Sequence, residues 1–176
     1  MTLSPIAIPP VAVTPCAAPP AKDRLVVSIE GNIGIGKSTL LANLRKRYAN
    51  DPRVAFVDEP VELWEANDLL GAMYRNELSR SSFQFMALTT RYTALLNSFN
   101  SEASIIITER SFLSDRYCFA AVNLESQADI LAYAVTHDAL VDSLPTDLRM
   151  GTVLLTAPRS VCAHRPHPTP GINQHV

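Results

Sequence analysis

A glycine-rich loop near the start of the chain constrains the fold more than any other stretch. It matches the phosphate-binding pattern G-x-x-x-x-G-K-[ST] and consists of Gly31, Asn32, Ile33, Gly34, Ile35, Gly36, Lys37, Ser38 and Thr39. A β-branched apolar run over residues 25–29 precedes it, and leucines at helical spacing follow between 40 and 44. This strand–loop–helix context is the one that the motif requires, and it argues against a chance match on a surface loop.

The chemistry of such a loop follows from its backbone. Glycines allow the N–H groups to turn inward, and the start of a helix favours anionic phosphate. In this sequence Lys37 would reach the outer phosphates, and Ser38 would offer its hydroxyl to Mg²⁺. We therefore expect a nucleotide-binding protein.

Composition limits the other classes of protein. A chain of 176 residues predicts one domain, and a net charge of -2 gives no basic surface for nucleic acid. The three cysteines lack metal-type spacing, which favours a reducing compartment. No apolar run approaches the ~20 residues that cross a bilayer. We expect a cytoplasmic protein without nucleic-acid or membrane partners, and a mitochondrial or other organellar location is the alternative.

Both ends of the chain differ in composition from the middle. Residues 1–22 contain six prolines and no acidic residue, which predicts a disordered leader; a transit peptide would usually carry several arginines. Residues 166–176 begin with three closely spaced prolines and predict a disordered tail. The histidines near that end have no element to fix them, so a metal site there is disfavoured. Residues 23–165 remain as the folded domain.

Short apolar runs over residues 54–57, 104–108 and 152–156 predict three further strands, with helices between them. Strands that alternate with helices imply a parallel α/β sheet. Glu59 and Glu109 follow two of these strands, and ligands gather beyond the carboxyl ends of parallel strands. Glu109 would suit Mg²⁺, although an ion pair with Arg110 is an alternative.

Four motifs in order resemble the deoxynucleoside kinases: the loop at residues 31–39, Glu-Pro-Val-Glu-Leu-Trp at 59–64, Phe-Gln at 83–84 and Glu-Arg-Ser at 109–111 with its continuation to 120. The resemblance runs from about residue 25 to 165. It implies a three-layer P-loop kinase fold, a parallel β-sheet flanked by helices. It also implies ATP-dependent phosphorylation of a deoxynucleoside 5′-hydroxyl with Mg²⁺, in nucleotide salvage.

The resemblance assigns a role to each motif residue. Glu59 matches the general base, Arg110 the arginine beside it, and Glu109, with Ser38, the Mg²⁺ site. The implied nucleoside pocket comprises Tyr74 at the sugar 3′-hydroxyl, Trp64, Leu70 and Met73 as walls, and Gln84 at the base edge. Most other apolar residues of the helical stretch 63–99 are expected to be core.

Two further positions concern the preferred base. Arg91 and Asp115 fall where deoxycytidine and deoxyguanosine kinases carry arginine and aspartate, whereas thymidine-preferring members usually have alanine at the second position. Such a pair would select exocyclic groups of cytosine or purines and crowd the thymine methyl. A solvated helix arginine is the alternative for Arg91.

The sequence also departs from the family pattern. The arginine-rich lid, the fifth strand and the adenine-packing segment have no counterpart, so the fold is expected to be incomplete at its C-terminal end. A weakly active or inactive nucleotide-binding paralogue is therefore the alternative to an enzyme. A nucleoside monophosphate kinase is disfavoured by the motifs at Glu59 and Glu109. The family pairs through segments corresponding to 79–100 and 113–124, which makes a homodimer an expected partner state.

Overall fold

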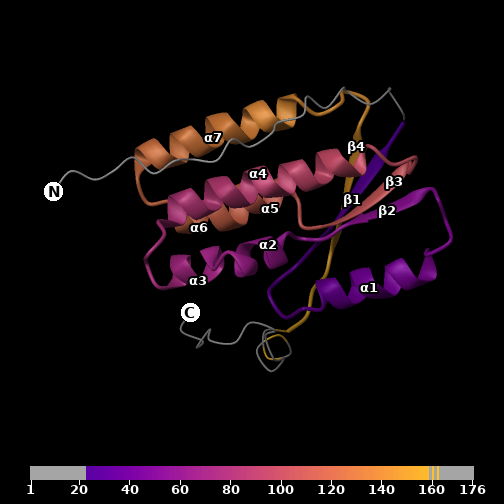
Figure 1. The fold of residues 1–176 in the computed structure, drawn as a ribbon, viewed down its shortest axis with the longest axis horizontal. Helices are drawn as coiled ribbons and strands as arrows, with labels where there is room; N and C mark the ends of the chain where they lie inside the picture. The colour runs from indigo at the N-terminus through magenta and orange to yellow at the C-terminus, as the bar shows by residue number, and fades with distance from the viewer. Residues whose placement is uncertain (1–22, 159, 161, 163–176) are drawn as a thin grey trace.

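The computed structural model describes residues 23–158, 160 and 162, so the predicted leader and tail lie outside the described residues. Within them, parallel strands form one sheet in the order β2-β3-β1-β4 (Figure 1). The strands are β1 (Leu25–Glu30), β2 (Val54–Val57), β3 (Ile105–Glu109) and β4 (Arg149–Leu154). The parallel α/β fold expected from the sequence is confirmed.

The central strands are apolar because both of their faces are covered. Val26 and Ile29 of β1 and Ile106 of β3 are almost completely buried. β4 lies at the edge of the sheet and is mostly exposed. The sequence pattern therefore predicted its bounds inaccurately. It was expected at 152–156, but it starts earlier because Arg149 donates its backbone N–H to the carbonyl of Arg24 at 2.9 Å.

Helices cover both faces of the sheet. α1 packs against β1 and β3, whereas α4 and α7 lie together on the opposite side (Figure 1). Ser79 and Ser126 cap α4 and α7 by accepting backbone N–H groups. The predicted helical stretch 63–99 is divided into separate helices by turns. The bounds are α1 Lys37–Arg47, α2 Val61–Ala66, α3 Leu69–Tyr74, α4 Arg80–Ser98 and α7 Gln127–Asp142.

The segment after β3 is not one continuous α-helix. It consists of α5 (Phe112–Ser114), a π-helix η1 (Asp115–Ala120) and α6 (Ala121–Asn123). Ser111 and Ser114 form a reciprocal capping box at its start. A π-helix is wider than an α-helix and is often found at functional sites. Here it begins with Asp115, which is 1% exposed.

Two apolar clusters hold the domain together. The larger one fills the space between the sheet and α4 and α7, and the smaller one joins α2, α3 and α4 around Trp64. No helix in the described part of the chain is both long and apolar enough to span a membrane.

Candidate active site

The glycine-rich loop joins β1 to α1 in the conformation that its sequence predicts. Gly36 caps α1 with a left-handed backbone (φ 104°), which a residue with a Cβ rarely adopts. Gly34 is also left-handed (φ 77°), and a Cβ there would lie 2.8 Å from the carbonyl oxygen of Cys162. Position 34 therefore has no space for a side chain.

Lys37 begins α1 and its ammonium group is held over the loop. Its Nζ donates to the carbonyls of Gly31 at 3.1 Å and Asn32 at 3.2 Å. Burial, helped by the positive charge of Arg110, lowers the pKa of Lys37, and nearby carboxylates oppose that shift. A phosphate group would supply negative charge to an ammonium group that has lost much of its hydration.

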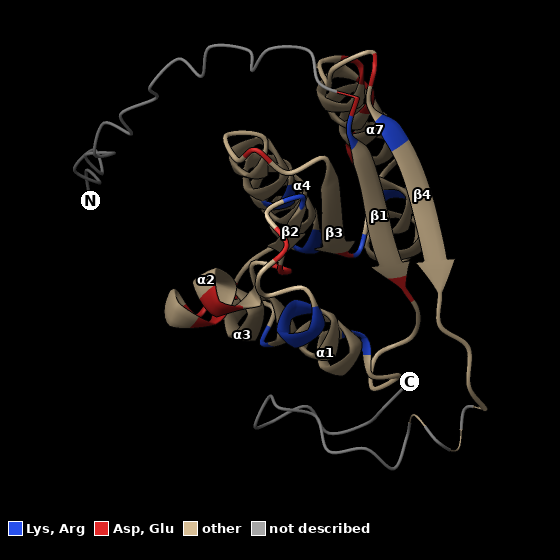
Figure 2. Cartoon of the chain, turned by 90° about the vertical axis from the view of Figure 1, so that its right-hand side faces the viewer, with Lys and Arg blue, Asp and Glu red and all other residues tan. Residues whose placement is uncertain are grey.

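Glutamates stand at the carboxyl ends of three neighbouring strands. Glu30 ends β1, Glu109 ends β3, and Glu59 lies two residues beyond β2; Figure 2 shows the acidic end of β1. All three act electrostatically on Lys37, so the loop and this edge of the sheet share one site. Glu30 was not predicted, although the strand-end position that selected Glu59 and Glu109 applies equally to it.

Glu109 and Ser38, the two residues expected to bind Mg²⁺, lie within hydrogen-bonding distance of each other. Ser38 Oγ donates to Glu109 Oε1 at 3.1 Å. Burial, and then the negative charge of Glu59, raise the pKa of Glu109, and a divalent cation would relieve both effects. Within the described residues no cluster of three or more His, Cys, Asp or Glu could hold a metal. These two oxygens suit Mg²⁺, which usually takes its other ligands from phosphates and water.

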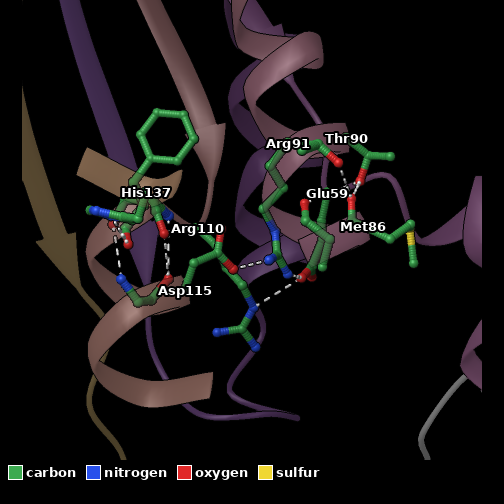
Figure 3. Close-up of polar contacts among 12 residues, drawn as sticks. Glu59, Met86, Thr90, Arg91, Arg110, Asp115 and His137 are labelled. Carbon is green, nitrogen blue, oxygen red and sulfur yellow. Dashed lines mark hydrogen bonds and ion pairs between the residues drawn. The ribbon is translucent and has the colours of Figure 1, made fainter. Parts of the chain in front are cut away.

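Glu59 lies between two guanidinium groups. Arg91 donates from Nη2 to Glu59 Oε1 and from Nη1 to Asp115 Oδ1, and Arg110 Nε lies 3.3 Å from the same Glu59 oxygen (Figure 3). Burial is the main cause that lowers the pKa of Arg91, and Glu59 opposes it. Arg91 is therefore a buried bridge between two carboxylates, not the solvated helix arginine that the sequence left open.

Arg110 has a strained backbone. Its φ is 69°, which is rare for a residue with a long side chain. Its backbone N–H donates to Ile29 at 3.1 Å, and its carbonyl accepts from the Thr108 hydroxyl at 2.9 Å. This turn aims the side chain at Glu59, and strain of this kind is concentrated at functional sites.

Aromatic rings support both guanidinium groups. The ring of Phe119 lies 5.8 Å from the Arg91 guanidinium and 4.6 Å from that of Arg110, and Trp64 lies 5.0 Å from Arg91. Phe119 was not predicted as a site residue. No local signal identifies it, because its direction depends on the π-helix that the sequence pattern did not reveal.

The remaining predicted pocket residues lie on α2, α3 and α4. Trp64 and Met73 are buried in the smaller apolar cluster with Leu70 packed against it, and Trp64 Nε1 donates to Thr90 at 3.1 Å. Gln84 is buried on α4, two turns before Arg91 and so on the same face. Tyr74 ends α3 and is 53% exposed.

A cavity of about 240 Å³ adjoins this network. Arg91, Glu109 and Arg110 contribute to its wall, and the rest of the lining is mainly apolar, with Phe112 and Leu95 among its residues. Arg91 and Arg110 contact Glu59, and Asp115 contacts Arg91. Leu70, Met73 and Gln84 do not line this cavity.

A phosphate-binding loop, a strand-end carboxylate pair and an arginine-flanked glutamate on a parallel sheet are consistent with the P-loop kinase fold. Comparison with known proteins gives the family. The deoxynucleoside kinase family model matches residues 27–167. The chain belongs to the deoxynucleoside kinase family.

Individual relatives agree with this assignment. The chain is 40% identical to a protein named as a probable deoxycytidine kinase of fowlpox virus, over 53% of this chain and 38% of that protein. It is 32% identical to human deoxycytidine kinase and 31% identical to the mouse enzyme, in each case over 79% of this chain and 64% of the relative. The chain thus spans less than two thirds of the length of these relatives.

Proposed function

We propose that this protein transfers the γ-phosphate of ATP, or of another nucleoside triphosphate, to the 5′-hydroxyl of a deoxynucleoside in nucleotide salvage. The observation that carries the proposal is the meeting of Lys37, Glu109 and the Glu59–Arg110 pair at one edge of the sheet. Phosphoryl transfer needs mainly positioning and charge stabilisation, and these groups supply both.

Each group has a task in this mechanism. Glu59 accepts the proton of the 5′-hydroxyl, and Arg110 positions that hydroxyl and stabilises negative charge as the bond to phosphorus forms. Lys37 and the loop backbone hold the phosphates. Ser38 and Glu109 would hold Mg²⁺, which neutralises phosphate charge when it is bound.

The base would be read from α4 and η1. Gln84 offers both a donor and an acceptor, while Arg91 offers a basic partner and Asp115 an acidic one. This set suits cytosine or a purine, so we propose deoxycytidine or purine deoxynucleosides as substrates. Trp64, Leu70 and Met73 would line the pocket, and Tyr74 would need to turn inward to reach the sugar.

Replacement of the proposed base tests the mechanism. Glu59→Gln should lower kcat by at least about a hundredfold on deoxycytidine, because the general base is lost while the shape is kept. Asp58→Asn is the matched control, since Asp58 pairs with Arg45 at 2.8 Å on the outside of α1. A Glu59→Gln variant with the rate of the native protein would contradict the assignment.

A nucleotide-binding protein with little or no turnover is the second candidate. Its support is that β4 forms an edge of the sheet in the described structure and is uncovered there. Its side chains Met150, Val153 and Leu154 are exposed. Calorimetric titration with ATP and with deoxycytidine, followed by a turnover assay, separates the two: binding of both without product favours this candidate.

We also propose that the protein is cytoplasmic and forms a homodimer. The exposed apolar side chains of Leu113, Tyr117 and Val122 lie in the 113–124 segment that the family resemblance assigns to pairing. Burial of such side chains between two copies would remove apolar surface from water. Sedimentation equilibrium of the native protein and of Val122→Asp tests the dimer.

A further inference from the structure

One guanidinium group links the two ends of the proposed nucleoside site. Arg91 donates from Nη2 to Glu59, the proposed catalytic base, and from Nη1 to Asp115, a proposed reader of the nucleobase. The side chain of Arg91 is 10% exposed, and those of Glu59 and Asp115 are 14% and 1% exposed. Water therefore competes weakly for these contacts.

The network is incomplete at the end where the nucleobase would bind. Arg91 Nε and Asp115 Oδ2 are both buried and have no hydrogen-bond partner in the described structure. Unsatisfied polar atoms of this kind cost about 1–3 kcal/mol each. A donor and an acceptor on a base edge would satisfy both atoms.

The network is crowded at the other end. One oxygen of Glu59 contacts both Arg91 and Arg110. The donors of a guanidinium group are fixed in one plane. A rotation of that plane toward a base at Nε would move Nη2 away from Glu59. Contact with the base and contact with Glu59 therefore compete for Arg91.

We propose that Arg91 is a positioning residue that couples the two ends: it occupies Glu59 until a nucleobase draws it away, which frees the carboxylate for the 5′-hydroxyl. This coupling rests on the proposed function. The Glu59 carboxylate is then available for catalysis only when a base is bound. A hydroxyl that binds without a suitable base meets a carboxylate that is still paired with Arg91.

The coupling has a consequence for binding that needs no turnover. If a nucleobase must break the Arg91–Glu59 contact, removal of the Glu59 charge should tighten nucleoside binding. The probes are the 2′,5′-dideoxy forms of cytidine, adenosine and guanosine, which lack the hydroxyl that Glu59 itself would bind. Glu59→Gln should lower the calorimetric Kd of the best probe about tenfold, the size expected for one hydrogen bond to a charged group.

A double-mutant cycle assigns the effect to Arg91. In an Arg91→Met background, Glu59→Gln should leave the Kd unchanged. If the Arg91→Met protein does not fold, Arg91→Lys is used as the background instead. Asp58→Asn is the matched control, because it removes one negative charge from the adjacent residue, whose carboxylate pairs with Arg45. The Kd of this control should equal that of the native protein.

Three results would overturn the coupling: a Kd for Glu59→Gln equal to or above that of the native protein, the same tightening in the Arg91→Met background, or the same tightening in Asp58→Asn. These results leave the proposed function intact if the native protein phosphorylates deoxynucleosides. Absence of phosphate transfer to every deoxynucleoside refutes the proposed function, whereas absence of binding to all three probes overturns the coupling.

Discussion

Tyr133 provides a test of the packing that supports the site. It lies on α7, is 2% exposed, and its hydroxyl has no hydrogen-bond partner in the described structure. Its ring stacks on His137 and meets Phe85 edge-on, and these contacts do not need the hydroxyl. Tyr133→Phe should therefore raise the free energy of unfolding by about 1 kcal/mol, because an unsatisfied buried hydroxyl is removed.

The same hydroxyl predicts a dependence on pH. Burial raises the pKa of Tyr133 to about 12, from 10.0, while the charge of Arg91 opposes the shift. The folded state thus keeps the proton that the unfolded state releases, and stability falls as pH rises from the unfolded pKa to the folded one. A shift of this size corresponds to about 3 kcal/mol over the whole interval.

Urea unfolding of the native protein and of Tyr133→Phe, near pH 8 and near pH 11, measures both effects. The advantage of the variant should grow by about 1 kcal/mol between the two conditions. Tyr92→Phe is the matched control, because the Tyr92 hydroxyl lies 2.6 Å from Ser143 Oγ, so its removal should destabilise the protein. A Tyr133→Phe variant less stable than the native protein at both pH values would refute the reasoning.

Further predictions concern the phosphate loop, the metal and the base. Gly34→Ala should weaken ATP binding and lower the free energy of unfolding by about 1–2 kcal/mol. The new Cβ would meet the Cys162 carbonyl, and the backbone there is left-handed. Calorimetry measures the binding and urea unfolding measures the stability. Ser38→Ala should raise the Mg²⁺ concentration for half-maximal rate about tenfold, and an unchanged Mg²⁺ titration would exclude Ser38 as a ligand. Asp115→Ala should lower the ratio of kcat/KM for deoxycytidine over thymidine about tenfold, because a donor on cytosine loses its acceptor; steady-state assays on both nucleosides test this.

The sequence by itself determined the phosphate loop and the parallel sheet. Both are local or periodic features: Gly34 and Gly36 are required by backbone conformation, and the apolar strands 25–29, 54–57 and 104–108 are required by burial. The positions of Glu59 and Glu109 followed as well, because the carboxyl ends of parallel strands meet at one edge.

Only the tertiary structure decided how the charged groups pair. Arg91 and Glu59 are 32 residues apart, and no local pattern indicates that one guanidinium bridges Glu59 and Asp115. The π-helix that turns Phe119 under two arginines was likewise hidden, because its periodicity differs from that of an α-helix by a fraction of a residue per turn. Backbone conformation is encoded locally in the sequence, whereas ion pairs between distant elements form only once the fold has brought those elements together.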